Sequence, residues 1–151
     1  MVALDGSAIS MGALEQAMGL AKDQNAELQA VYVVEYPHVY IADVGYDPVS
    51  VMEPLVKEGQ RVLEKVELLM KARQLVPSSR LIDNGYALGS IAEQLQAAAD
   101  DCKADLVVLG THGRGGFKRL LLGSVAEAFL RLSTRPMLLV PGKPHEDFQR
   151  N

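Results

Sequence analysis

The sequence is poor in cysteine, tryptophan and positive charge, and each shortage excludes a class of protein. The single cysteine, Cys102, excludes an internal disulfide and is typical of a protein of the reducing cytoplasm. The absence of tryptophan and an aromatic content of 5% argue against a surface on which single-stranded nucleic acid would stack. The formal net charge of −4 lacks the basic field of a general nucleic-acid binder. We therefore expect a cytoplasmic protein that does not bind nucleic acid.

Long apolar runs are also absent. No run approaches the ~20 residues that a helix needs to span a bilayer, so we expect no membrane partner. The opening stretch, MVALDGS, is too short and too polar for a signal peptide. The chain nevertheless has 151 residues, 48% of them hydrophobic, which is enough for one domain with its own core. We expect that domain over residues 1–141, followed by a polar C-terminal tail over residues 142–151.

Short apolar stretches alternate with helical patterns along the chain. The expected strands cover residues 2–4, 27–35, 78–85, 104–109 and 137–140. The expected helices cover residues 10–24, with Ser10 as the cap, 50–74, 90–101 and 124–132. Such alternation predicts an α/β fold: an open, doubly wound sheet of five parallel strands with helices on both faces. Residues 36–49, between the second strand and second helix, are expected to form a loop.

Two loops of this fold are expected to meet at a ligand site. In doubly wound sheets the ligand lies beyond the carboxyl ends of the strands, where the strand order reverses. The residues that leave the first and fourth strands are Asp5-Gly6-Ser7 and residues 110–113. These two stretches therefore line the predicted crevice.

The loop after the fourth expected strand has the features of an anion site. Five of the chain's 13 glycines lie between Gly110 and Gly123, and three cations lie among them: Arg114, Lys118 and Arg119. A helix is expected to begin directly after Gly123, and a helix N-terminus attracts anions. The Ser124 hydroxyl could cap that helix or donate to a phosphate. No Gly-Lys-Ser/Thr closes a P-loop frame. The pattern favours a phosphate-binding loop over glycines that only form turns.

The spacing Gly110-x2-Gly113-x9-Gly123-Ser124 resembles the G-2x-G-9x-G-[S/T] signature of the ATP-binding universal stress proteins. The flanking text DLVVLGTHGRGG, RLLLGSVAE and RPMLLVP is also similar, and the resemblance extends from Val2 to Pro141. It implies the strand order 3-2-1-4-5 and ATP at the point where that order reverses, together with Mg²⁺ or Mn²⁺. It also implies a homodimer that pairs through the last strand. The dimer residues would be Met137, Leu138, Leu139 and Val140.

The resemblance also implies roles for individual residues. Ala3 and Leu4 would line the adenine pocket, and the Val33 backbone would meet the adenine edge. Asp5 would hold the ribose or the neighbouring phosphate and metal. The residues that would flank the ribose are Leu109 and Gly110, and those that would wrap the phosphates are Gly113, Gly123, Ser124 and Val125.

This sequence departs from the family pattern at two places. Only four residues precede Asp5, so we expect that the native protein has further residues before Met1. The segment after the third strand, often Gly-x-Pro in the family, reads Gly85-Tyr86-Ala87 here, which alters that turn.

Three functions are consistent with these residues. The first is an ATP-binding stress factor that responds to nucleotide. The second is a slow ATPase or phosphoryl-transfer enzyme, for which Asp5 or His112 could position water. The third is an interaction protein with little dependence on nucleotide. The sequence contains no convincing set of nucleophile, base and orienting residue, so the binding function is favoured and no catalytic residue is assigned.

Overall fold

The computed structural model describes residues 1–36, 48–84, 89–111 and 122–142. Its elements are β1 (Val2–Leu4), α1 (Ala8–Gln24), β2 (Ala30–Val33), α2 (Pro48–Ala72), β3 (Ser79–Ile82), α3 (Ile91–Asp101), β4 (Val107–Gly110), α4 (Ser124–Leu132) and β5 (Met137–Val140). The predicted order of strands and helices is confirmed. The bounds of β1, α4 and β5 are those predicted, whereas β2 and β3 are shorter than expected and β4 begins and ends later.

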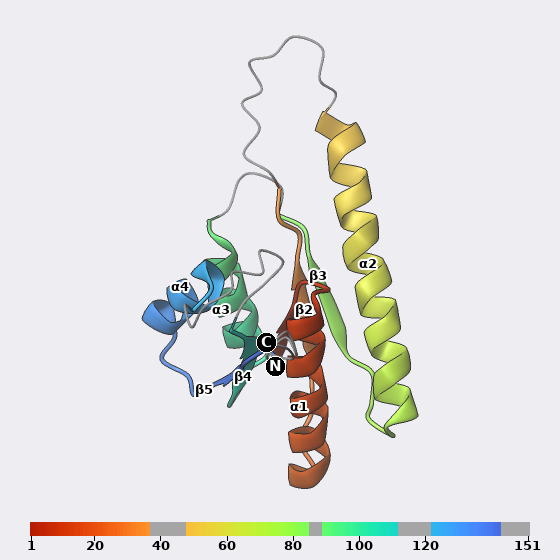
Figure 1. The fold of residues 1–151 in the computed structure, drawn as a ribbon, viewed down its shortest axis with the longest axis vertical. Helices are drawn as coiled ribbons and strands as arrows, with labels where there is room; N and C mark the ends of the chain where they lie inside the picture. The colour runs from red at the N-terminus through yellow and green to blue at the C-terminus, as the bar shows by residue number, and fades with distance from the viewer. Residues whose placement is uncertain (37–47, 85–88, 112–121, 143–151) are drawn as a thin grey trace, which may run out of the picture.

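The five strands form one parallel sheet in the order β3-β2-β1-β4-β5, which confirms the predicted topology. Figure 1 shows α3 and α4 on one side of this sheet, with α2 on the other. Side chains alternate between the two faces, as the pleat of a strand requires. In β1, Leu4 joins the core under α1 and α2, while its neighbour Ala3 joins the core under α3 and α4. Both faces of the central strands are therefore buried.

The capping residues of α1 and α4 each differ from the sequence prediction. The cap of α1 is Ser7 rather than Ser10: the Ser7 Oγ accepts from the Ser10 N–H at 3.1 Å, and the helix begins at Ala8. Ser10 is buried inside the first turn, and its hydroxyl donates back to the Ser7 carbonyl at 3.0 Å. At α4 the cap is Gly123, so Ser124 is the first helical residue and not a capping one.

Arg135 connects the turn before β5 to the end of α3 and to the segment between α3 and β4. Its Nη1 donates to the Ala104 carbonyl at 2.6 Å, and its Nη2 and Nε donate to Asp100 Oδ1 at 2.7 and 3.1 Å. Hydrogen bonding from Arg135, with a further bond from Gln96, holds the pKa of Asp100 below its ordinary value of 3.8. The charged carboxylate therefore favours the folded chain above that pH.

The pH dependence of this contact is testable. We expect Asp100→Asn to lower the melting temperature slightly at pH 7, because the carboxylate partner of Arg135 is lost. The difference from the wild type should shrink as the pH falls below 3.8 and vanish once the pH is also below the lowered pKa of Asp100 in the folded chain, since protonation then removes the same charge from the wild type. Thermal melts at several pH values measure this, and a difference that persists at low pH would contradict the account.

Candidate functional site

The strand order reverses at β1, which lies between β2 and β4. The chain leaves β1 toward α1 and leaves β4 toward α4, and these two helices belong to opposite layers. Such a reversal opens a crevice at the carboxyl edge of the sheet. The stretches predicted to line it, Asp5-Gly6-Ser7 and Gly110-Thr111, both lie at this edge. Residues 112 and 113 of the second stretch lie outside the described residues.

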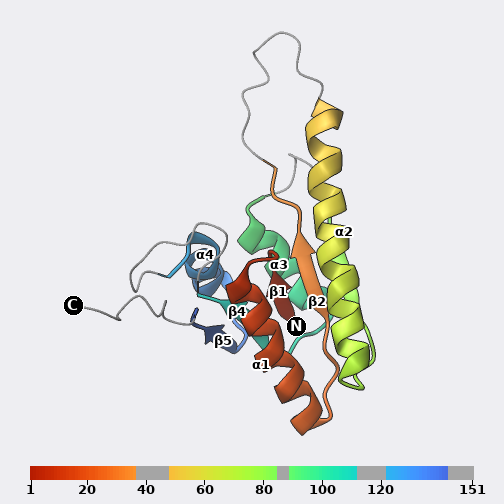
Figure 2. The same cartoon turned by 45° about the vertical axis from the view of Figure 1, so that its right-hand side comes forward.

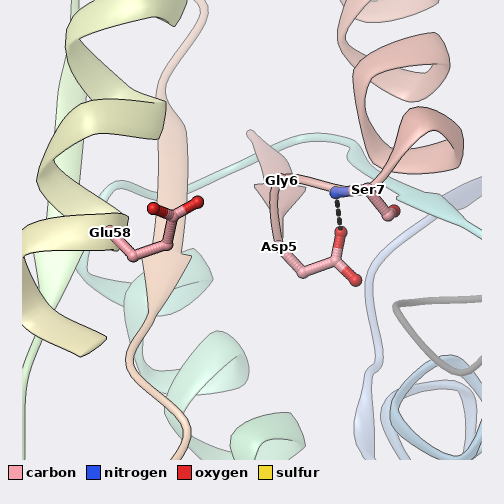
Figure 3. A pocket seen from close by; sticks show the side chains of 4 residues that line it. All are labelled: Asp5, Gly6, Ser7 and Glu58. Carbon is pink, nitrogen blue, oxygen red and sulfur yellow. Dashed lines mark hydrogen bonds between the residues drawn. The ribbon is translucent and has the colours of Figure 1, made fainter. Parts of the chain in front are cut away.

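A tight turn forms the exit of β1. Asp5 Oδ1 accepts from the Ser7 N–H at 2.9 Å, and Gly6 has a φ of +80°, which a residue with a side chain rarely adopts. The turn opens onto a pocket of about 470 Å³ that is lined by Asp5, Gly6, Ser7 and Glu58. In Figure 3 the Glu58 side chain extends from α2 toward the turn. Asp5 thus has two roles here, because it stabilises the turn and presents a carboxylate to the pocket.

Hydrogen bonds bring the two ends of the glycine-rich loop together. The Gly123 N–H donates to the Thr111 carbonyl at 2.7 Å, and the Thr111 N–H donates to the Val140 carbonyl at 2.9 Å. The N-terminus of α4 therefore lies directly at the exit of β4. Gly113 and the three cations predicted to assist it, Arg114, Lys118 and Arg119, lie outside the described residues.

The N-terminus of α4 differs from the N-termini of α1 and α3. In α1 the Ser7 side chain caps the helix, and Asp5 accepts from the Ser7 N–H. In α3 the caps are reciprocal, because Ser90 accepts from the Glu93 N–H while the Glu93 carboxylate accepts from the Ser90 N–H. Gly123 has no side chain with which to cap α4. Among the described residues, α4 is therefore the one of these three helices whose first N–H groups have no capping side chain, and such groups attract anions.

Four further predicted site residues belong to the core of the sheet, and Val125 packs against that core from α4. Ala3, Leu4, Val33 and Leu109 are all buried in the sheet, with Leu4 alone facing α1 and α2. Backbone direction singles out Val33. The N–H groups of Ala30 and Val34 donate toward β3. Because the direction alternates along a strand, the backbone N–H and C=O of Val31 and Val33 point toward β1. Since β1 ends at Leu4, which pairs with Tyr32, this pairing uses the Val33 N–H, and the Val33 carbonyl faces the space beyond the end of β1.

A second hollow continues along the same edge. It has a volume of about 400 Å³ and is lined by Tyr36, Met52, Glu53, Val56, Lys57, Gln60 and Asp83. The Tyr36 hydroxyl donates to Asp83, which joins the exits of β2 and β3. Two hollows thus lie at the carboxyl edge, one at the exit of β1 and one at the exits of β2 and β3, and α2 contributes residues to both. Figure 2 shows α2 beside β2.

Glu58 is the pocket residue that sequence reasoning missed. It lies on the exposed side of a long amphipathic helix, where a glutamate gives no signal of a ligand. Within the described ranges, no group of three or more His, Cys, Asp or Glu side chains could hold a metal ion by itself. Of the helices described, none is both long enough and apolar enough to cross a membrane.

The family model for universal stress proteins matches residues 1–141. This chain belongs to the universal stress protein family. The universal stress protein MJ0531 of Methanocaldococcus jannaschii is 34% identical over 149 residues, covering 97% of this chain and 83% of that protein. The crystal structure of a universal stress protein from Burkholderia pseudomallei is 35% identical, with a TM-score of 0.76 over 93% of this chain and 95% of that one.

A third relative bears on the ligand of universal stress proteins. It is a universal stress protein solved in complex with cAMP, 27% identical to this chain, with a TM-score of 0.64. The match covers 92% of this chain and 93% of that one. The fold and the family predicted from the sequence are thus both confirmed.

Proposed function

We propose that this universal stress protein binds ATP across the carboxyl edge of its sheet and acts as a nucleotide-responsive stress factor in the cytoplasm. The observation that carries the proposal is the N-terminus of α4. It has a glycine in place of a capping side chain, and a hydrogen bond from Gly123 to Thr111 fixes it at the exit of β4. Unpaired N–H groups and the helix dipole together bind phosphate groups.

The spacing of the strands suggests how ATP would lie. Neighbouring strands are about 4.8 Å apart, which is comparable to the step from phosphate to ribose and from ribose to base. With the phosphates at α4, beyond β4, the ribose would lie over β1, beside Asp5. The base would lie over the exit of β2, where the Val33 backbone faces. This layout agrees with the role that the family resemblance implies for each of these residues.

The Asp5 carboxylate at this edge is also a suitable ligand for a divalent cation that binds together with the nucleotide. Mg²⁺ is usually held by one or two carboxylates together with substrate phosphates and water, and Asp5 lines the pocket as such a carboxylate. When bound, the ion would neutralise part of the phosphate charge. The cAMP complex of the 27% identical relative supports an adenine nucleotide as the ligand.

A thermal-shift titration with ATP, ADP and AMP tests the proposal. A ligand that binds only the folded chain at 100 times its Kd stabilises it by about 2.7 kcal/mol. For a domain of this size we expect a rise in melting temperature of roughly 5–10 °C. No shift with any adenine nucleotide at millimolar concentration would overturn the proposal. If the protein releases phosphate from ATP and the Asp5→Asn variant does not, the slow ATPase is favoured instead.

We further propose that two copies pair through β5. This strand is an edge of the sheet, and its apolar side chains remain only partly buried. An unpaired edge of this kind invites another strand. We expect a dimeric mass by sedimentation at tens of micromolar.

A proline variant tests the dimer directly. The register with β4 turns the Leu139 N–H toward the open edge, because Val140 and Pro136 bond to β4. Leu139→Pro should therefore give a monomer, whereas Leu139→Ala, which loses the same side chain but keeps the N–H, should remain more dimeric. A monomeric wild type would contradict the proposal.

A further inference from the structure

A buried hydroxyl lies behind the exit turn of β1. Ser10, in the first turn of α1, is only 4% exposed. Its Oγ accepts from the Asp5 N–H at 3.4 Å and donates to the Ser7 carbonyl at 3.0 Å. A hydroxyl can do both at once. The Ser10 side chain therefore connects the end of β1 to the start of α1.

The direction of the Asp5 N–H shows which partner the Ser10 hydroxyl replaces. The Val2 N–H donates toward the start of β2, and N–H directions alternate along a strand, so the Asp5 N–H points toward β4. In a sheet that continued, it would donate to a carbonyl of β4. However, β1 pairs with β4 at Val2 and Val108, and the register described for these two strands goes no further. Ser10 thus supplies the acceptor at the point where β1 and β4 separate.

The same turn is held by three further contacts. Asp5 Oδ1 accepts from the Ser7 N–H at 2.9 Å (Figure 3), and the Ser7 Oγ accepts from the Ser10 N–H at 3.1 Å. From the other side, α2 packs against the turn, because a Cβ added at Gly6 would lie 3.0 Å from Val62 Cγ2. The turn is therefore confined on both sides, and the backbone that carries the Asp5 carboxylate has a defined position.

We infer that Ser10 is a positioning residue of the nucleotide site. It keeps the end of β1 apart from β4, where the strand order reverses, and it holds Asp5 where the carboxylate reaches the ribose or the accompanying metal ion. Ser10 is buried and acts through Asp5, without touching the ligand. The inference rests on the proposed function, since that function gives Asp5 its role in binding.

Replacement of the Ser10 hydroxyl tests this role. Isothermal titration at a temperature well below melting should show that Ser10→Ala weakens ATP binding about tenfold, the size of effect expected for one hydrogen bond. Ser10→Thr retains a hydroxyl and should recover most of the affinity. The matched control is Ser79→Ala, which removes a hydrogen bond of 2.6 Å to Glu67 at the amino end of β3. It should leave ATP binding unchanged.

A double-mutant cycle with Asp5→Asn distinguishes positioning from a general effect on the fold. Asparagine keeps an oxygen that can accept from the Ser7 N–H but loses the charge that binds the ribose or metal. If Ser10 acts through Asp5, the Ser10→Ala change should weaken ATP binding about tenfold in the wild type and less than about twofold in the Asp5→Asn background. A purely structural role for Ser10 predicts the same factor in both backgrounds.

The outcomes separate this inference from the proposed function. If the wild type binds ATP and Ser10→Ala binds it equally well, or the two changes are independent, Ser10 does not position Asp5 and the proposed function stands without it. If the wild type does not bind ATP, the proposed function fails and the inference fails with it. If Ser10→Ala does not fold, Ser10→Cys takes its place in the cycle, because a thiol is only a weak acceptor.

Discussion

Replacing Gly123 by aspartate is expected to reduce the affinity for ATP by at least about 100-fold while making the free protein slightly more stable. Gly123 has a φ of −62° and a ψ of 151°, the extended geometry that a capping aspartate adopts. Its carboxylate would accept from the first N–H groups of α4 and favour the helix dipole, a gain of about 0.3–1 kcal/mol. The same carboxylate would occupy the place of the phosphate and repel its negative charge. This like-charge repulsion would cost several kcal/mol of binding free energy.

Opposite effects on stability and on binding make this variant informative. Gly123→Asn provides the matched control, because it introduces a cap of the same size without the charge. We expect it to weaken ATP binding less than aspartate does. Thermal melts without ligand and calorimetric titration with ATP measure the two quantities. An aspartate variant that binds ATP as tightly as the wild type would place the phosphates elsewhere.

Replacing Phe129 by alanine is expected to cost about 3–5 kcal/mol of folding free energy. Phe129 is fully buried, and with Ala126 it is one of the two buried residues that attach α4 to the core. Removing a buried aromatic side chain loses its transfer free energy and leaves a cavity. For a domain of this size, each kcal/mol lowers the melting temperature by about 2–4 °C. The melting temperature should therefore fall by roughly 6–20 °C.

The neighbouring residue is the control for this prediction. Leu130 lies on the same helix but is 52% exposed, so Leu130→Ala should change the free energy of unfolding much less. Urea unfolding of the three proteins gives the free energies directly. Equal losses for Phe129→Ala and Leu130→Ala would mean that α4 is not anchored as described, and the anion site at its N-terminus would lose its support.

The sequence predicted best those elements that are bounded by strong local signals. Two prolines bracket β5, Gly123 marks the start of α4, and each of these elements has the predicted bounds. The apolar alternation of strands and helices was enough for a parallel sheet, because buried strands need helices on both faces. The glycine spacing indicated the family, and the strand order was predicted from the resemblance to that family.

Tertiary contacts account for what the sequence did not reveal. Ser7 and Ser10 are both capping residues by type, and only the turn that Asp5 forms shows that the helix begins after Ser7. Glu58 becomes a pocket residue because Gly59 lets α2 approach the sheet, a contact between segments far apart in the chain. No local pattern on α2 encodes that approach. Gly113 lies outside the described residues, and its role stays a prediction.

An NMR titration of backbone amides with ATP tests the central claim most directly, because it reports where the ligand lies. We expect the largest shift changes at Ser124 and Val125, at the start of α4, with further changes at Asp5 and Val33. The chemical shifts of amides at the amino ends of the strands, such as that of Ala104 before β4, should remain unchanged. Changes confined to that opposite edge, or none at millimolar ATP, would contradict the proposal that this chain binds the nucleotide at the reversal of its strand order.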